Sequence, residues 1–405
     1  MQDFSIREKC TVNTNWEEDT FVGFMCENGK FSVHFPLGFR MVDTDKELRK
    51  DIIMLLNTIG MTTGKRDSKL QQTSKVYNEV AFPFQSYLYV IKDYFERGYY
   101  KERESRYVVS KRGKIDWNRT IKTQEAYVQD GNVFYLDFVT KKNSLNEDEL
   151  ISLIHEYCVY DSFSKVGWLF TDQLPKQPRI KFKYKLFYSV LRQKIAGTFN
   201  DKNKRLFMEM LAIVEYKAGR SDSSNYKYGT YRFEYVWEML IDKVYGIVAK
   251  ERYFPSTSWI INGVSYSNAC LEPDTIMICN GNIYVLDAKY YKYGATRRVS
   301  DLPESTSINK QITYGEYIAE QEDFKKIHGN DYKVYNAFLM PYAAKEDETI
   351  ENIGLAISNW KSNVNSYEKI QGILLDVKHL MRLGISQNET EIAKLALEIE
   401  KAMEG

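Results

Sequence analysis

The sequence predicts a mixed α/β fold: a C-terminal domain with a mixed sheet flanked by helices, preceded by an N-terminal α+β region. The chain has 405 residues, which exceeds the usual size of a single domain. Residues 218–230 contain Gly-Arg-Ser-Asp-Ser-Ser-Asn and lack apolar periodicity, as linkers do. After them, helix, hairpin, helix and strand patterns follow one another up to residue 340. We therefore expect two domains, residues 1–220 and residues 221–405.

The N-terminal region alternates between strand and helix patterns. Residues 1–45 hold two alternating apolar runs around the turn Glu27-Asn28-Gly29, which predicts a pair of strands. Apolar residues at helical spacing predict a helix over residues 45–59. The other segments expected here are a helix over residues 81–98, strands and turns over 106–138, and helices over 146–162, 181–196 and 206–216.

The C-terminal domain begins with a strongly amphipathic helix over residues 231–248. Asn280-Gly281 then separates two β-prone runs, residues 275–279 and 283–291, and this dipeptide is the strongest short-range hairpin signal. The other elements expected in this domain are a helix over residues 307–322, a strand over 334–340, a further helical stretch, and a final amphipathic helix near 390–403.

Composition excludes several classes of protein. The formal net charge is +1, so any surface that binds nucleic acid must be local. The five cysteines form no CxxC pair, which argues against a zinc ribbon or a disulfide framework and suits a reducing compartment. The amino terminus has no apolar signal region, and no apolar run approaches the length of a transmembrane helix. We therefore expect a cytoplasmic protein that does not enter a membrane.

Two aspartates are expected to face each other across the C-terminal hairpin. If Asn280-Gly281 forms the loop, Cys279 pairs with Asn282, and counting back along the ladder places Asp274 opposite Asp287. Directly opposed positions hold their Cβ atoms about 5 Å apart. Two carboxylates this close repel each other unless a cation lies between them. The register therefore predicts a divalent-metal site, with Mg²⁺ as the expected ion and Mn²⁺ as its substitute.

Two neighbours of Asp287 complete this expected site. Alternation along the strand puts Lys289 on the same face as Asp287, where its ammonium can help position a water and offset charge on a phosphate. The backbone carbonyl of Ala288 is another hard ligand. An isolated Asp-x-Lys is usually a surface strand pair. Here it follows the apolar run Ile-Tyr-Val-Leu, which predicts a strand buried on both faces.

The helices on either side of the hairpin offer further candidates. Glu234 and Glu238 lie one turn apart on the preceding helix, and Glu234 is the one expected to add a carboxylate; the alternative is a solvated helix face. On the following helix, Gln311 and Tyr314 share a face and could brace the site or contact a phosphate, with ordinary packing as the alternative. Lys310 adjoins them and can reach a backbone phosphate.

A basic stretch spans residues 176–205, with ten Lys or Arg against one acid, Asp201. Lysine and arginine that neutralise phosphates supply most of the non-specific affinity for DNA. The expected phosphate contacts in this stretch are Lys181, Lys183, Lys185 and Arg192. The same residues could instead dock an acidic partner surface or form a solvated helix face.

Several catalytic motifs are absent from the sequence. The four histidines are widely spaced, so zinc or HNH-type chemistry lacks its residues. The segment Gly60 to Arg66 superficially suggests a phosphate loop, but its spacing is one residue short and no Ser or Thr follows the lysine. Gly-x-Ser-x-Gly is missing as well. If nucleotide hydrolysis is involved, another chain carries it out.

These motifs carry a family resemblance. Glu272-Pro273-Asp274 and Asp287-Ala288-Lys289, with the flanking helices, resemble the PD-(D/E)xK nuclease superfamily. Phe233-Glu234 before them and Gln311 to Tyr314 after them are similar to the McrC branch of restriction nucleases, although many RecB-like members space the Gln and Tyr by four residues rather than three. Phe35-Pro-Leu-Gly-Phe39 and Gly113-Lys-Ile-Asp-Trp-Asn-Arg-Thr-Ile121 resemble the LlaJI-type restriction endonucleases, which are relatives of McrC.

The resemblance implies a PD-(D/E)xK nuclease core and a Mg²⁺-dependent endonuclease subunit of an McrBC-like or LlaJI-type restriction system. Such a subunit hydrolyses phosphodiester bonds of foreign double-stranded DNA together with an AAA+ motor of McrB type, which uses GTP or ATP. By resemblance, Asp274 and Asp287 are the metal carboxylates, Lys289 the catalytic lysine and Glu234 the helix glutamate. Residues 1–220 would then dock the motor.

Other functions stay open at the level of sequence. The same chemistry would serve a nuclease specific for RNA or for DNA junctions. A catalytically silent scaffold that activates an AAA+ motor is an alternative from another class, against which the intact Asp, Asp and Lys set counts. Cutting both strands takes two nuclease centres, so dimerisation of the nuclease domain is also expected.

Overall fold

The computed structural model describes residues 5–16, 19–63, 82–146, 149–171, 173–219, 225–268, 270–329, 331–345, 348–384 and 386–404. The chain forms two compact units. Unit 1 contains residues 1–77 and 224–405, and unit 2 contains residues 78–223. The later boundary lies near the division expected from the sequence. The first 77 residues, however, belong with the C-terminal part of the chain.

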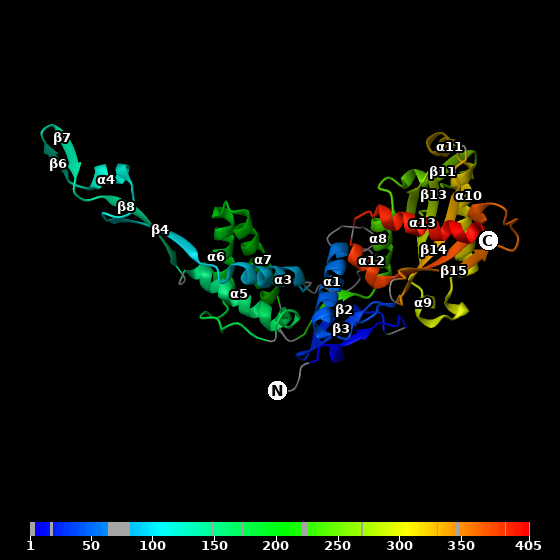
Figure 1. Ribbon diagram of the computed structural model, residues 1–405, viewed down its shortest axis with the longest axis horizontal. Helices are drawn as coiled ribbons and strands as arrows, with labels where there is room; N and C mark the ends of the chain where they lie inside the picture. Colours follow the sequence, from blue (N-terminus) through cyan, green and yellow to red (C-terminus); the bar gives the residue numbers. More distant parts are fainter. Residues whose placement is uncertain are drawn as a thin grey trace. The chain divides into compact units, whose positions relative to one another are not determined.

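A five-stranded mixed sheet forms the centre of the C-terminal part of unit 1 (Figure 1). Its strands, in spatial order, are β12 (Thr275–Cys279), β13 (Asn282–Ala288), β14 (Val334–Tyr342), β16 (Lys369–Asp376) and β15 (Ile350–Ile357). The β13, β14 and β16 strands are parallel, and the two outer strands run antiparallel to their neighbours. Every residue of β14 is buried, as expected for a central strand covered on both faces.

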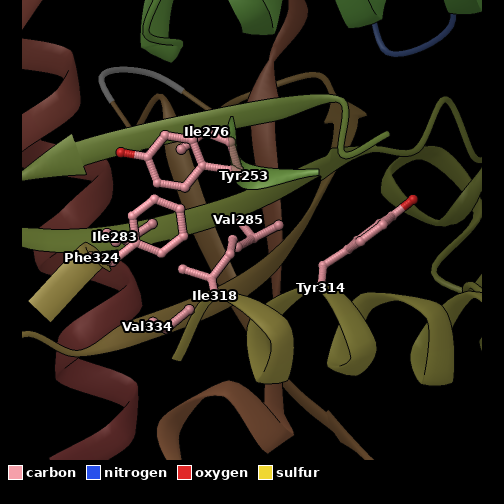
Figure 2. Close-up of a cluster of buried hydrophobic side chains, with 8 residues drawn as sticks. All are labelled: Tyr253, Ile276, Ile283, Val285, Tyr314, Ile318, Phe324 and Val334. Carbon is pink, nitrogen blue, oxygen red and sulfur yellow. The ribbon is translucent and has the colours of Figure 1, made fainter. Parts of the chain in front are cut away.

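Helices cover both faces of this sheet. On one face, α10 (Ser305–Glu320) packs Tyr314 and Ile318 against Ile283 and Val285 of β13 (Figure 2). The next residue of β13, Tyr284, points to the opposite face and donates its hydroxyl to Glu400 of α13 (Glu389–Glu404). The α8 helix (Phe233–Tyr245) packs with α13 and β12 and buries its predicted apolar face. Successive side chains of β13 therefore face different helices, α10 on one side of the sheet and α13 on the other.

The N-terminal residues of unit 1 form a second sheet, of strand order β1-β3-β2-β9. Its β2 (Val22–Glu27) and β3 (Lys30–Phe35) strands are the predicted pair, and the turn between them uses positive φ at Asn28 and Gly29. The flanking strands are β1 (Cys10–Val12) and β9 (Tyr226–Thr230). The α1 helix (Asp45–Thr63) buries the apolar positions that predicted it.

The β9 strand corrects the expectation of a linker over residues 218–230. Tyr226–Thr230 pairs with β2 in an antiparallel ladder, while residues 220–224 of the expected linker lie outside the described residues. The strand was missed because Tyr-Lys-Tyr-Gly-Thr has little apolar content and gains its conformation from its partner.

Unit 2 is built on four helices. They are α3 (Phe84–Arg97), α5 (Leu150–Val166), α6 (Tyr184–Gly197) and α7 (Asp201–Ala218). Four helices were predicted here, over residues 81–98, 146–162, 181–196 and 206–216, and each overlaps one of the observed helices. Residues 81, 147 and 148 lie outside the described part of the chain.

A long two-stranded ladder of unit 2 leads away from these helices (Figure 1). It pairs β4 (Glu102–Val109) with β8 (Val139–Asn146), and β5 (Lys114–Ile115) joins the β8 edge. At its far end lie the hairpin of β6 (Ala126–Gln129) and β7 (Asn132–Tyr135) and the helix α4 (Trp117–Thr123). The sequence predicted only strands and turns here; α4 begins because the Asp116 side chain accepts the Arg119 N–H.

Two further pairs of strands were not predicted. The β15 and β16 strands lie where a helical stretch was expected, and only α12 (Val377–Leu383) is helical between them and α13 in the described part. The β16 strand is apolar on both faces, so its periodicity does not distinguish a strand from a buried helix. A separate hairpin of β10 (Ser258–Ile261) and β11 (Val264–Ser267) precedes β12. None of the helices described has the length and apolar content needed to cross a membrane.

Candidate active site

The hairpin of β12 and β13 brings Asp274 beside Asp287. Cys279 pairs with Asn282 as predicted, and the loop residues Asn280 and Gly281 both have positive φ. The ladder continues to Thr275 and Leu286, so the next positions along it are the two aspartates. Asp274 extends its Oδ2 atom past this point and accepts the Ala288 N–H at 2.9 Å. The carboxylates therefore lie at the carboxyl end of a buried parallel strand.

Charged side chains lie close together at this strand end. Asp287 is only 7% exposed, and its Oδ2 atom lies 2.6 Å from the Lys289 ammonium nitrogen. Burial, the nearby Asp287 and then Glu238 raise the pKa of Asp274 to about 7. Burial lowers the pKa of Lys289, but the two aspartates outweigh it, so the pKa of this lysine is raised. The charged Lys289 ammonium therefore lies beside the two carboxyl groups.

The backbone on both sides of Asp274 is fixed by side chains from other elements. The Lys250 ammonium donates to the Asp274 carbonyl and forms an ion pair with Asp242 of α8, with 2.7 Å between Nζ and Oδ1. Tyr314 donates its hydroxyl to the Glu272 carbonyl at 3.1 Å. Sequence reasoning missed Lys250 and Asp242, because neither lies in a motif and only the fold brings them to the hairpin.

Gln311 lies in the core between α10 and the sheet. Its side chain is 1% exposed, and Nε2 donates to the Val285 carbonyl at 2.7 Å and to Asn336 Oδ1 at 3.3 Å. Gln311 thus stabilises the strand that carries Asp287. Because its side chain is buried, it is not placed to contact a phosphate. Lys310 is exposed and hydrogen-bonds the Tyr314 side chain, which raises the pKa of the lysine.

Two glutamates of α8 differ in their surroundings. Glu234 forms an ion pair with Arg232 at the start of the helix. Glu238, one turn later, is the glutamate whose charge raises the pKa of Asp274. The sequence favoured Glu234 as the helix carboxylate. The helical spacing that relates the two could not show which of them faces the hairpin.

The segment Phe35 to Phe39 lies against the end of the same strand. Leu37 donates its N–H to the Tyr290 hydroxyl at 2.7 Å, one residue after Lys289. Gly38 has a φ of +77°, and a Cβ there would lie 2.9 Å from the Tyr342 Cα. The Lys289 N–H itself donates to the Leu339 carbonyl at 2.9 Å, which also accepts from the Trp237 indole at 3.1 Å. The N-terminal sheet is thus attached beside the candidate site.

The predicted phosphate contacts lie in another part of the chain. Lys181 and Lys183 precede α6, and Lys185 and Arg192 lie on it; all four side chains are exposed. They belong to unit 2, whereas the aspartates belong to unit 1.

The donor set at the hairpin fits a hard divalent cation that keeps part of its water shell. No three His, Cys, Asp or Glu side chains among the described residues gather in a metal-binding group. The available ligands are the carboxylates of Asp274 and Asp287 and the carbonyl of Ala288. Mg²⁺ is commonly bound through one or two carboxylates and several waters. Burial and then the charge of Asp287 raise the pKa of Asp274, and a bound cation would offset both effects.

Comparisons with known proteins relate this chain to restriction enzymes. The sequence profile of the LlaJI restriction endonuclease family matches residues 21–365. Component YdjA of the type II restriction enzyme BsuMI from Bacillus subtilis (strain 168) is 24% identical over 261 residues, covering 60% of this chain and 55% of that protein. The chain thus matches about half the length of this curated relative. One chain of the half-complex from a tetradecameric assembly of Thermococcus gammatolerans McrB AAA+ hexamers with bound McrC is 16% identical, with a TM-score of 0.37, covering 94% of this chain and 82% of that one.

Proposed function

Because the chain belongs to the LlaJI restriction endonuclease family, we propose that it is the nuclease subunit of a restriction system and hydrolyses phosphodiester bonds in foreign double-stranded DNA. The observation that carries the proposal is the cluster of Asp274, Asp287 and Lys289 at the end of β13. We place this activity in the cytoplasm, where incoming DNA arrives.

We propose that the five-stranded sheet and its helices are a PD-(D/E)xK core. Its support is a β-hairpin with a carboxylate on each strand, followed by a parallel strand and covered by helices on both faces. The lysine two residues after Asp287 lies on the same side of the strand and is ion-paired with it. Two copies of this core would be needed to cut both strands of a duplex.

In this proposal Asp274, Asp287 and the Ala288 carbonyl hold Mg²⁺, for which Mn²⁺ can substitute. When bound, the ion supplies a Lewis acid and a water of lowered pKa. The charged Lys289 offsets the negative charge that builds up on a phosphate during hydrolysis. Tyr314, Gln311 and Lys250 hold the strands that carry these groups. Glu238, and Glu234 at the start of the same helix, are the further carboxylates that we consider as additional ligands.

We further propose that an AAA+ NTPase of McrB type is the partner. The described N-terminal residues, 5–16 and 19–63, belong to unit 1 together with the five-stranded sheet. Within the docking region expected at residues 1–220, we therefore assign the partner contact to unit 2. Its β6–β7 hairpin exposes apolar side chains, with Val128 73% exposed and Val133 58% exposed. Exposed apolar groups of this kind commonly mark protein contacts.

A nicking assay on supercoiled plasmid tests the nuclease. The full chain, with its partner NTPase, is expected to cut in Mg²⁺, and Asp287→Asn is expected to lose at least about 100-fold in rate because a metal carboxylate is removed. Asp323→Asn, which changes an exposed aspartate of α11 (Glu322–His328), serves as the control.

The outcomes separate the alternatives. Cleavage by Asp287→Asn at the wild-type rate would remove the catalytic claim. A wild-type chain that never cuts DNA, yet still stimulates NTP hydrolysis by the partner, is a scaffold. Preferential cutting of RNA or of a four-way junction over linear duplex would change the substrate class.

A further inference from the structure

Unit 2 carries a surface whose positive charge is not compensated. Between Gln173 and Asn200 the sequence has no Asp or Glu, while the Lys and Arg residues are Lys176, Arg179, Lys181, Lys183, Lys185, Arg192 and Lys194. Arg179 forms an ion pair with Glu156 at 2.6 Å. Within the described chain, Lys181, Lys183 and Lys185 form no ion pair, and Arg192 contacts only the Tyr188 ring. These four residues are called the basic face below.

Packing beneath the basic face fixes its direction. Phe182 stacks on Tyr157 with 5.6 Å between ring centroids and meets Phe187 edge-on at 5.4 Å. Because Phe182 is held inward, the exposed Lys181 and Lys183 on either side of it are directed outward. The half-buried Phe182 ring is therefore held by the Tyr157 and Phe187 rings.

The α6 helix extends the same face along its axis. Phe187 and Leu191 are buried, four residues apart, and define its core side. Lys185, Ser189 and Arg192 are exposed and share the opposite side. Lys185 and Arg192 are two turns apart, about 10 Å along the helix. The cations thus continue in a line rather than gathering at one point.

The basic face offers hydrogen-bond donors and positive charge. Ser189 adds a hydroxyl between the two cations of the helix. The first turn of α6 contains no acidic residue, and no side-chain hydrogen bond caps it, so the positive end of its dipole at Lys183, the N-cap residue, is not offset there. Lys, Arg, Ser and backbone N–H groups are the donors that proteins use on phosphate oxygens.

We propose that this basic face binds the phosphate backbone of duplex DNA without reading its sequence. The inference rests on the proposed function, because it names a surface that holds the nuclease's own substrate. It concerns unit 2, however, and needs neither the carboxylates nor the metal. A line of exposed lysines that ends in an arginine fits contacts to the phosphate backbone, which carry no sequence information.

Binding of a fluorescein-labelled random duplex of about 30 bp to the full chain in EDTA tests the proposal, with KCl varied between about 50 and 200 mM. The variant Lys181→Gln/Lys183→Gln/Lys185→Gln/Arg192→Gln is expected to bind roughly tenfold more weakly or worse. Its slope of log Kd against log salt is expected to fall by about 3 to 4, since each lost phosphate contact removes about 0.9.

A matched variant controls for the loss of four charges. Lys325, Lys326, Lys394 and Lys401 each form an ion pair with an acid three residues away on the same helix. Changing these four to Gln is expected to leave both the affinity and the salt slope unchanged. Circular dichroism melts show whether each variant is folded, and the single changes Lys183→Gln and Arg192→Gln give intermediate slopes if the quadruple variant is not.

Three results would overturn the proposal. One is an unchanged affinity and slope in folded basic-face variants, which leaves a solvated helix face. Another is an equal loss in the control variant, which makes the effect one of overall charge. The third is displacement of the duplex by poly-glutamate as readily as by unlabelled DNA at equal charge, which assigns the face to an acidic protein. Because the assay contains EDTA, a chain that proves not to cut DNA can still pass it.

Discussion

The Lys250 ammonium holds the backbone carbonyl of Asp274 while it forms an ion pair with Asp242, so one lysine ties the hairpin to α8. Supports of this kind orient metal ligands, and removing one typically costs 10–100-fold in metal affinity or activity. We expect Lys250→Met to raise the Mg²⁺ concentration needed for half-maximal nicking by roughly tenfold or more. A titration of plasmid nicking against Mg²⁺ measures this.

The conservative change separates positioning from general destabilisation. Lys250→Arg keeps the charge and is expected to recover part of the lost Mg²⁺ affinity. Lys326→Met, on an exposed turn of α11, is the control. If Lys250→Met is folded and shows the wild-type Mg²⁺ dependence, the lysine does not position Asp274.

Gly38 adopts a left-handed conformation and lies close to the backbone of Tyr342. Its φ is +77°, and a Cβ would meet the Tyr342 Cα at 2.9 Å. Gly29 has a nearly identical φ of +75°, but a Cβ there meets no atom within 4 Å. We expect Gly29→Ala to cost about 1–2 kcal/mol of stability, the usual cost of a left-handed L-residue, and Gly38→Ala to cost distinctly more.

Thermal or urea unfolding followed by tryptophan fluorescence compares the two variants. The difference between them isolates the contact with Tyr342, because the backbone strain is common to both. Equal losses of stability would mean that Gly38 does not lie close to Tyr342 at the end of β14.

His155 makes the stability of unit 2 depend on pH. Burial, and then the charge of Arg97, lower its pKa from 6.5 to about 3. Its Nδ1 atom accepts the Tyr100 N–H at 2.9 Å, so the neutral ring is the form that the fold holds. The folded pKa lies below the unfolded one. The stabilisation is therefore complete above about pH 6.5 and is lost as the pH falls toward 3, by up to about 1.4 kcal/mol per pH unit.

Hydrogen exchange of α5 peptides, compared between His155→Gln and wild type at the same pH, measures this effect. At about pH 7 the variant is expected to be the less protected protein, since it lacks the buried ring. At about pH 5 the difference in protection between the two proteins is expected to be smaller, because only the wild type loses the stability that depends on a neutral His155. Peptides of unit 1 provide the internal reference. A difference in protection that is the same at both pH values would contradict the role assigned to His155.

The sequence predicts best where local chemistry decides the structure. Asn280-Gly281 supplies two positive φ values, and this alone fixes the register that leads to Asp274 and Asp287. The α1 and α8 helices were predicted from the helical spacing of their apolar residues, which is also a local pattern. The resemblance to LlaJI-type endonucleases, drawn from short motifs, is confirmed by a family match over most of the chain.

Elements that depend on distant partners escape prediction. The β9 strand has no apolar run and exists because β2 lies beside it. The β16 strand is apolar on both faces, so no period reveals it. Lys250 reaches Asp274 only after folding, and which of Glu234 and Glu238 acts on that aspartate depends on how α8 is rotated against the hairpin. None of these relationships is encoded in a local pattern.

The pairing of β2 with β9 has a consequence for how the chain is made. Residues 22–27 leave the ribosome early, yet their partner strand at residues 226–230 follows only after the whole of unit 2 has been synthesised. Unit 2 is thus an insertion between the first three strands of this sheet and its fourth strand, β9. Asp274, Asp287 and Lys289 follow β9 in the sequence, so they too reach their positions only after unit 2 has been synthesised.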